Sequence, residues 1–171
     1  ERVKKLEEIL DVESFVTKAV NEYSGTIYKV AFHITCNKDD AYDVCQDVFL
    51  RLFNNFEKIK DDEHLKAWLI RVAVNRAKSY CTKGFKKNTV PIDDVNENEL
   101  IAENKKDNTI DKVLKLPEKY RVVIHLFYYQ EMSIEEISDT LQIGKSAVKT
   151  RLSRGRKLLE KIIREEEALG G

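Results

Sequence analysis

Residues that interrupt helices are scarce in this sequence, which has 6 Gly and 2 Pro among 171 residues. A helix interior tolerates Gly and Pro least, so a chain with few of them can form long helices. Apolar residues also recur at steps of three and four over most of the sequence, as one face of a helix requires. Hydrophobic residues make up 42% and charged residues 35%, which is typical of a folded chain. We therefore predict an all-α fold.

Three helices are expected in the first half of the chain. The opening residues form a charged amphipathic segment, and Gly25 is a candidate kink in the apolar spacing that follows. Residues 37–40 predict a turn and a helix N-cap. The predicted elements are a first helix that runs to residue 34, a second helix over 41–56, a polar loop over 58–63 and a third helix over 64–80.

The segment 84–109 differs in composition from the chain on either side. Its polar run over 93–108 breaks the apolar periodicity. We interpret the segment as a flexible linker, with room for one short helix within 97–105. The resulting prediction is two small helical domains, over residues 1–83 and 110–171.

The last part of the chain has the pattern of a helix-turn-helix. Ser133 and Glu136, three residues apart, form a capping box that predicts a helix start at Ile134. Gly144 lies in the turn, where we expect a positive φ that suits a residue without a Cβ. The predicted helices of this domain cover 111–116, 118–130, 134–141 and 145–166, and Pro117 opens the second of them.

The last helix carries a basic face, with six basic residues and no acidic one between Lys145 and Leu159. A helix fits the DNA major groove, where its N-terminal side chains reach base edges and phosphates. A basic stripe by itself is most simply a solvated surface, but the capped helix and turn before it favour DNA contact. The predicted contact residues, the reading set, are Lys145, Ser146, Lys149, Thr150, Arg151, Ser153, Arg154 and Lys157.

Two polar surfaces are expected on the first domain. The second helix carries a row of side chains that suits a basic protein surface, namely Asp39, Asp40, Asp43, Gln46 and Asp47. A simpler role, complementing the helix dipole, explains Asp39 and Asp40 but not Asp47. Around the third helix, aromatic residues lie among many cations, a combination that suits single-stranded DNA, although a lone Trp is more often a core residue. These aromatic residues are Trp68, Tyr80 and Phe85.

Four blocks of the sequence resemble, in order and spacing, the extracytoplasmic-function (ECF) sigma factors of bacterial RNA polymerase, a subfamily of the sigma-70 family. The blocks are residues 40–50; Phe56 with Trp68, Leu69, Ala73 and Asn75; residues 116–118 with Arg121 and 132–137; and residues 148–156. The sequence departs from the family at Tyr42, where Glu is frequent, and in the loop over 59–65, which lacks the usual Gly and Ser.

The resemblance implies a protein that directs core RNA polymerase to promoters, with no catalytic residue, cofactor or metal of its own. The implied partners are the clamp helices of the largest polymerase subunit, the flap of the second-largest subunit, promoter DNA and an anti-sigma factor. The implied location is the bacterial cytoplasm, without membrane insertion. The second domain would read the −35 element with the reading set.

The resemblance also assigns two sets of residues to the first domain. The polymerase set, expected on the clamp helices, is Asp40, Asp43, Gln46, Asp47, Leu50 and Arg51. The −10 set, expected to capture the melted −10 element, is Lys58, Lys60, Asp61, Asp62, His64, Lys66, Arg71, Asn75, Arg76 and Lys78.

Four other interpretations fit parts of the sequence. A regulator that acts without the polymerase would dimerise on palindromic half-sites, and no heptad seam of useful length is visible. A metalloenzyme or metal sensor would draw on His33, Cys36, Cys45, His64 and Cys81, although the first two suit packing or surface positions better. A structural adaptor would leave the basic helix without a role. A phosphate-binding loop at Gly144 is rejected, because Asp139 stands where that motif needs another Gly.

Overall fold

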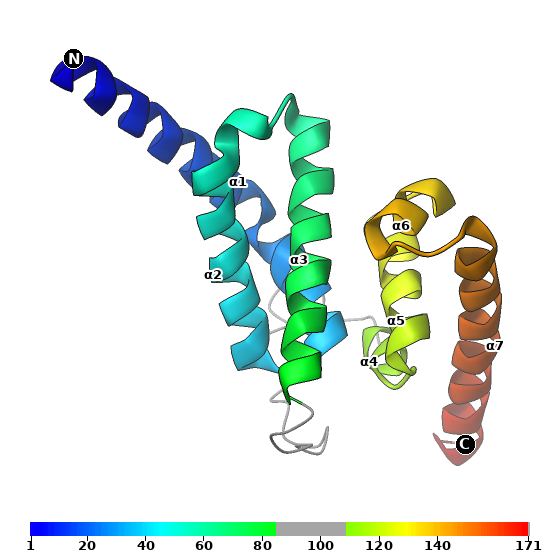
Figure 1. Ribbon diagram of the computed structural model, residues 1–171. Coiled ribbons are helices and arrows are strands. Elements are labelled where there is room, and N and C mark those ends of the chain that lie inside the picture. The colour runs from blue at the N-terminus through cyan, green and yellow to red at the C-terminus, as the bar shows by residue number, and fades with distance from the viewer. Residues whose placement is uncertain (85–108, 171) are drawn as a thin grey trace. The chain divides into compact units, whose positions relative to one another are not determined.

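The computed structural model describes residues 1–84 and 109–170, which are helical apart from short connections (Figure 1). No strand occurs among these residues, so the all-α prediction is confirmed. The chain divides into two compact units, Glu1–Phe85 (unit 1) and Lys86–Gly171 (unit 2). Almost all of the predicted linker, together with its short helix and Phe85, lies outside the described residues.

Unit 1 is built from three helices, α1 (Arg2–Thr35), α2 (Lys38–Asn55) and α3 (Asp62–Gly84). A short 3-10 turn, η1 (Phe56–Lys58), follows α2. Figure 1 shows α2 and α3 running antiparallel, and each helix of the unit contacts the other two. Burying an aliphatic side chain contributes about 1.5–3 kcal/mol, so the core holds the three helices together. Its largest fully buried members are Ile27, Val30, Val44, Leu52, Leu69 and Ile70.

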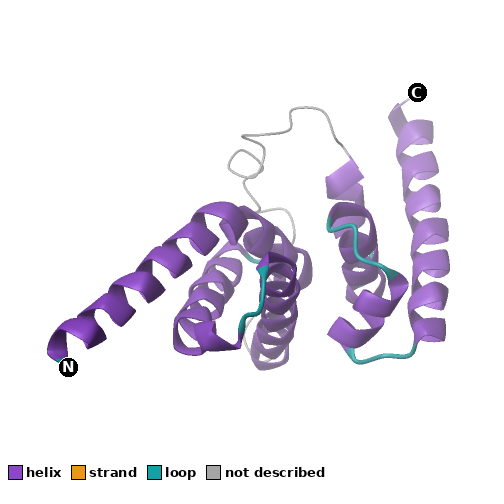
Figure 2. Cartoon of the chain, turned by 90° about the horizontal axis from the view of Figure 1, so that it is seen from above, coloured by secondary structure: helices purple, strands orange, loops and turns teal. Residues whose placement is uncertain are grey.

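The first helix is longer than the core of unit 1 requires. It continues through Gly25 without a break, and a Cβ added there would meet no atom within 4 Å. Its residues before Val12 are exposed, and Figure 2 shows this end extending away from α2 and α3. At its other end Cys36 adopts a left-handed conformation with φ of 51°, and its N–H donates to the Phe32 carbonyl at 2.8 Å.

Side-chain caps determine where α2 and α3 begin. The Asn37 amide oxygen accepts a hydrogen bond from the Asp40 N–H at 2.9 Å, which confirms an N-cap within residues 37–40. The helix starts at Lys38 rather than at the predicted residue 41, because the first residue of that segment is the cap. The Asp61 carboxylate accepts from the His64 N–H at 2.7 Å in the same way. Each bond satisfies an N–H that the first turn of a helix leaves without an intrahelical partner.

Unit 2 contains four described α-helices, α4 (Thr109–Leu114), α5 (Glu118–Ile124), α6 (Ile134–Leu141) and α7 (Lys145–Gly170). The first three all contact α7, which is therefore the central support of the unit. Figure 1 shows α5 and α7 side by side. Fully buried side chains from these helices and from the segments that connect them fill the core, including Leu116, Ile124, Leu126, Ile137 and Leu152.

A π-helical turn interrupts the helix that we predicted over residues 118–130. The turn, η3 (His125–Tyr129), follows α5 directly. The Gln130 N–H donates to the His125 carbonyl at 3.2 Å, which is the five-residue bond of a π-turn rather than the four-residue bond of an α-helix. The hydrophobic periodicity continues across this turn, so the sequence pattern alone did not reveal it.

The left-handed residue between α6 and α7 is Gln142, not Gly144 as we predicted. Gln142 has φ of 55°, whereas no Gly in the described residues has a positive φ. Gln142 is the C-cap of α6, and its N–H donates to the Ser138 carbonyl. Its side-chain amide donates to the Asp139 carbonyl at 2.6 Å. The reversal therefore happens at the end of α6, two residues before Gly144, because hydrogen bonds there satisfy the terminal carbonyls.

Candidate nucleic-acid and protein interfaces

The predicted capping box is present at the start of α6. The Glu136 N–H donates to the Ser133 hydroxyl at 3.1 Å, and the Ser133 N–H donates to the Glu136 carboxylate at 2.7 Å. At the other end of α6, the Ser138 hydroxyl donates to the Ile143 carbonyl at 2.5 Å. These bonds fix α6 and the turn after it, so the direction in which α7 starts is also fixed.

The buried side of α7 packs closely against α5. Val148, Leu152 and Gly155 are its buried residues, and they define the side that faces the core. A Cβ added at Gly155 would lie 3.1 Å from Ile124 Cγ1 and 3.3 Å from Tyr120 Cβ. Both distances are tighter than ordinary van der Waals contact, so Gly155 allows α5 and α7 to approach closely.

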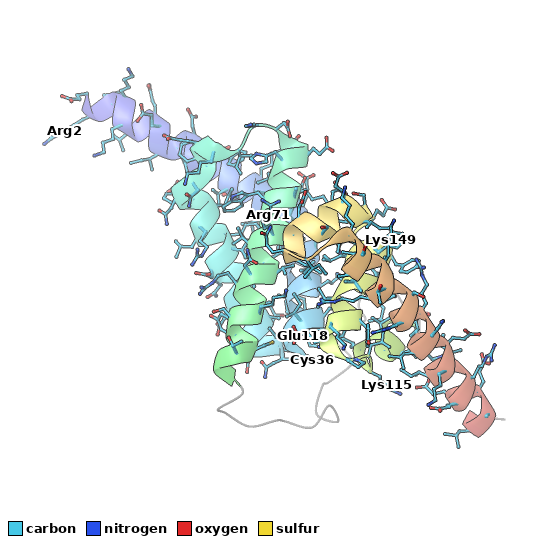
Figure 3. The ribbon with its side chains drawn as sticks, turned by 45° about the vertical axis from the view of Figure 1, so that its right-hand side comes forward. Arg2, Cys36, Arg71, Lys115, Glu118 and Lys149 are labelled. Atoms are coloured by element: carbon cyan, nitrogen blue, oxygen red, sulfur yellow. The ribbon has the colours of Figure 1, made fainter. Side chains whose placement is uncertain are left out.

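The opposite side of α7 presents most of the reading set. Seven of its eight residues are exposed, while Arg151 is half-buried. Lys145, Lys149 and Ser153 follow one another at four-residue steps and so form a row along the helix (Figure 3 labels Lys149). Arg151 follows buried Val148 by three residues, which places it on the core side of the helix and apart from the others.

The cations of the reading set make few ion pairs within unit 2. Lys145 Nζ lies 3.4 Å from Glu135 Oε1, and both side chains are exposed. No other cation of the set forms an ion pair with a described residue. An exposed pair contributes little, so the exposed side of α7 retains nearly all of its positive charge.

Arg156 lies just beyond this row and has an aromatic partner. Its Nε donates to the Tyr128 hydroxyl at 2.5 Å. Its guanidinium carbon lies 5.6 Å from the ring centroid of Phe127 and 5.5 Å from that of Tyr128. Arg156 belongs to a family block of the sequence but not to the reading set, and no sequence signal linked it to Tyr128, 28 residues earlier.

The exposed side of α2 mixes acidic and apolar groups from the polymerase set. Asp43 and Gln46 are exposed, and Leu50 is 61% exposed on the same helix. Asp40 is half-buried, and its pKa is raised by burial first and then by the neighbouring carboxylates of Asp43 and Asp39. The departure at Tyr42 adds an aromatic ring, whose centroid lies 4.8 Å from that of Tyr28 on α1.

Asp47 joins the polymerase set to the −10 set inside the protein. Its carboxylate accepts a hydrogen bond from Arg51 Nε at 3.0 Å, one turn along α2. The same oxygen forms an ion pair with Arg76 Nε on α3. The structure thus brings two polymerase-set residues together with one −10 residue, and it explains why Asp47 did not fit a helix-dipole role.

The loop between α2 and α3 is tied by hydrogen bonds that residues of the −10 set form with one another and with Asn55. Lys58 Nζ donates to the Asn55 side chain at 2.8 Å, and the Lys60 N–H donates to His64 Nδ1 at 3.1 Å. Asp61 caps α3, while Asp62 is exposed in its first turn. These bonds give the loop a defined conformation although it lacks the Gly and Ser of the family pattern.

Along α3 the remaining −10 residues differ in exposure. Arg71 and Asn75 are exposed, whereas Lys66 and Lys78 are half-buried (Figure 3 labels Arg71). Trp68 is also half-buried, so it is neither a full core residue nor a freely exposed ring. Arg71, Asn75 and Lys78 follow one another at steps of four and three residues, so they share one side of α3.

The three cysteines lie in unit 1, and none of them forms a disulfide bond with a described residue. Burial raises the pKa of Cys45 to about 12, which keeps this thiol protonated at neutral pH. Among the described residues, no group of three or more His, Cys, Asp or Glu side chains is arranged to hold a metal ion.

None of the described helices combines the length and the apolar composition that a membrane-spanning segment requires.

Comparison with known proteins identifies the family. Residues 19–85 match the family description "Sigma-70 region 2", and residues 107–159 match "Sigma-70, region 4". The ECF RNA polymerase sigma factor SigW of Bacillus subtilis is 32% identical over 163 residues, which cover 85% of this chain and 87% of that relative. The chain belongs to the ECF sigma factors. It is therefore a transcription initiation factor that binds core RNA polymerase and directs it to promoter DNA.

Other relatives of this sigma factor extend the comparison. RNA polymerase sigma factor SigV of Bacillus subtilis is 25% identical over 160 residues, covering 91% of this chain and 95% of the relative. The sigma factor RpoE, solved with the anti-sigma factor NepR from Bartonella quintana, has the same fold with a TM-score of 0.69 at 18% identity. That match covers 86% of this chain and 96% of the solved one. CnrH, solved with the cytosolic domain of CnrY, matches with a TM-score of 0.61 at 19% identity and covers 90% of each chain.

Proposed function

We propose that the two domains of this sigma factor, residues 1–83 and 110–171, divide promoter recognition between them. The second domain reads the −35 element through α7. One observation carries this assignment: α7 presents a row of exposed cations with no acidic residue between Lys145 and Leu159, on a helix whose start is fixed by a capped partner helix. The N-terminal part of such a helix reaches base edges in the major groove, and its flanks contact phosphates.

The first domain contacts the polymerase through α2. Exposed Asp43, Gln46 and Leu50 supply charge, hydrogen bonding and apolar surface on one helix, and half-buried Asp40 lies at its start. Asp47 and Arg51 also belong to this surface, but their mutual hydrogen bond must loosen before either binds the clamp helices. A basic surface on the clamp helices complements this face and speeds association.

The same domain captures the melted −10 element with the loop after α2 and with α3. Cations of the −10 set pair with phosphates, and unpaired bases stack on nearby rings. Melting costs about 1.4 kcal/mol for each base-pair step that unstacks. Each captured base returns about 1–3 kcal/mol by stacking, which offsets part of that cost.

The polymerase makes the two contacts cooperative. Core RNA polymerase holds both domains at promoter spacing, so that the second DNA contact becomes intramolecular and gains from effective concentration. The sigma factor supplies recognition and strand capture and no catalytic residue, because nucleotidyl transfer belongs to the polymerase. The protein works in the bacterial cytoplasm, where the polymerase and the promoter are found.

An anti-sigma factor is the expected regulatory partner. The RpoE structure contains that sigma factor in complex with the anti-sigma factor NepR, and the CnrH structure contains the cytosolic domain of CnrY. The fold of RpoE and that of CnrH match this chain. A partner that covers the exposed side of α2 would block polymerase binding without touching α7.

In vitro transcription with core polymerase and fragmented genomic DNA tests the proposal. Adding the sigma factor should start transcripts at a small set of sites that share −10 and −35 sequences, and core polymerase alone should not. A protein that binds core polymerase but leaves the start sites unchanged would overturn the proposed function.

A further inference from the structure

We infer that Arg156 is a further DNA-phosphate contact of α7 and that Tyr128 is its positioning residue. The inference rests on the proposed role of α7 in −35 recognition. Arg156 lies outside the reading set, and Tyr128 lies on a different element, the π-turn η3. The π-turn ends the helical segment that starts with α5, and it places Tyr128 next to α7.

The contacts of Arg156 hold its side chain in one arrangement. Its Nε donates to the Tyr128 hydroxyl at 2.5 Å, and its guanidinium lies over the rings of Phe127 and Tyr128. The two rings themselves meet edge to face, with centroids 5.0 Å apart. A flexible arginine normally loses rotamer freedom when it binds a partner. Here much of that loss has already occurred, so binding an anion costs less.

These contacts leave the charge of Arg156 available. Tyr128 and Phe127 are neutral, and Arg156 forms no ion pair with a described residue. By contrast, Arg164 further along α7 is hydrogen-bonded to Glu160 at 2.6 Å. The bond to Tyr128 uses the Nε hydrogen, so the two terminal nitrogens of Arg156 remain for an external anion. A planar guanidinium can bind phosphate through paired hydrogen bonds.

The position of Arg156 along α7 suits a phosphate rather than a base. Arg156 follows Lys145 by eleven residues and Lys149 by seven, so the three lie on one side of the helix. At 1.5 Å per residue, Arg156 lies about 16 Å from the start of the helix. The major groove is about 12 Å wide, so a helix that places its start against base edges carries Arg156 to the phosphates that border the groove.

A purely structural role is the alternative, in which Arg156 joins α7 to η3 and never touches DNA. The two roles differ in their response to salt and sequence. A phosphate contact releases a counterion and adds about 0.9 to the slope of log K against log salt. A structural bond between two helices changes stability and leaves that slope unaltered.

The test measures promoter binding by polymerase holoenzyme reconstituted with the full-length sigma factor, over a series of KCl concentrations. Arg156→Ala should weaken binding about tenfold and reduce the salt slope by about 0.9, to the same extent on DNA with an intact or a scrambled −35 element. Tyr128→Phe removes only the hydroxyl and should weaken binding about threefold. Tyr129→Phe is the matched control, because it removes the hydroxyl of the neighbouring exposed tyrosine, and it should bind like the parent protein.

A double-mutant cycle tests the link between the two residues. Tyr128→Phe should have no further effect on binding once Arg156 is Ala, because its hydroxyl then has nothing to position. An unchanged salt slope for Arg156→Ala, or an equal effect of Tyr128→Phe in both backgrounds, overturns the inference. Lys149→Ala in the same assay separates the two claims: if it weakens binding to the intact −35 element while Arg156→Ala does not, only this inference fails. If neither weakens binding, the proposed function of α7 fails.

Discussion

The two units offer their candidate contact residues in opposite ways. In unit 1 several of these residues are engaged with one another: Asp47 binds Arg51 and Arg76, and the loop after α2 is tied through Lys60 and His64. In unit 2 the reading set is exposed except for Arg151, and apart from Lys145 its cations make no ion pair with described residues. Support for that surface comes from the other side of α7, where Gly155 meets α5.

This difference affects what binding costs each unit. A partner of unit 1 must replace internal ion pairs and hydrogen bonds, so its net gain is the difference between two sets of contacts. DNA that meets α7 adds contacts to side chains that had few. We therefore expect substitutions in the reading set to affect binding alone, and substitutions at Asp47 to affect both binding and folding.

The largest effect is expected from reversing charge on α7. Lys149→Glu with Arg154→Glu should abolish transcription from promoters that need a −35 element, at least a hundredfold, because two phosphate or base contacts become repulsive. Binding to core polymerase, measured by fluorescence anisotropy, should stay within twofold. Promoter-specific transcripts that survive this pair would show that another element reads the −35 sequence.

A second charge reversal on α7, outside the reading set, tests whether the position of the charge matters. Lys161→Glu with Arg164→Glu makes the same change in charge beyond the basic segment, where both residues have acidic partners. Transcription should remain within about threefold of the parent protein, provided that circular dichroism shows an unchanged helix content. A loss as large as that of the first pair would mean that net charge, rather than the reading face, controls promoter binding.

The next largest effect is expected from the packing contact between α7 and α5. Gly155→Val should destabilise unit 2 by about 2–3 kcal/mol, because its side chain has no space against Ile124 and Tyr120. Gly25→Ala in unit 1 should instead stabilise the protein by about 0.5–1 kcal/mol, since that helical position faces open space. Thermal and urea unfolding followed by circular dichroism measure both. Equal responses at the two positions would contradict the described helix contact.

A smaller effect is expected on α2, where substitutions of Asp43 and Asp47 should differ in their effect on stability. Asp43→Lys should weaken binding to core polymerase about tenfold and leave unfolding unchanged, because Asp43 is exposed. Asp47→Lys should also lower the free energy of unfolding by about 1 kcal/mol, because it removes a carboxylate that pairs Arg51 with Arg76. Titration with core polymerase and urea unfolding distinguish them. If polymerase affinity is unaltered in both variants, α2 is not the polymerase contact.

The smallest effect is a dependence of unit 2 on pH. A hydrogen bond from Lys115 lowers the pKa of Glu166, so this carboxylate stabilises the fold when ionised (Figure 3 labels Lys115). Its contribution is complete above the ordinary pKa of a glutamate and is lost as pH falls through the lowered value. Glu166→Gln should therefore lower the melting temperature slightly at pH 7, and the difference should vanish in acid. Glu167→Gln, one residue along, is the control and should show no such trend.

Much of the fold could be predicted because its signals are local. The capping box at Ser133 and Glu136, the N-cap at Asn37 and the helix boundaries of α6 each depend on residues within four positions of one another. The basic row on α7 was likewise visible from four-residue spacing, since a helix converts that spacing into one face. The structure confirmed these features with only small changes at helix ends.

Other features depend on contacts between distant residues and were missed for that reason. Gly155 leaves room for the side chains of Ile124 and Tyr120, which lie some thirty residues earlier. Asp47 forms an ion pair with Arg76 on the next helix. Residue type alone predicts a positive φ at Gly144. The positive φ lies at Gln142 instead, because the hydrogen bonds at the end of α6 decide the conformation there. The roles of the reading set, the polymerase set and the −10 set remain predictions.

The π-turn after α5 has a consequence for how sequences of this kind can vary. Such a turn is equivalent to an α-helix with one inserted residue, and removing a residue before Tyr128 would rotate Tyr128 by about 100° around the axis of α5. Arg156 would not follow that rotation, because α7 packs on α5 at Gly155, against residues that precede the turn. Tyr128 would then point away from Arg156, although no amino acid at either position had changed. A deletion of one codon in the π-turn would thus separate Tyr128 from Arg156. Insertions and deletions at this turn should therefore change the surroundings of Arg156 more than substitutions do.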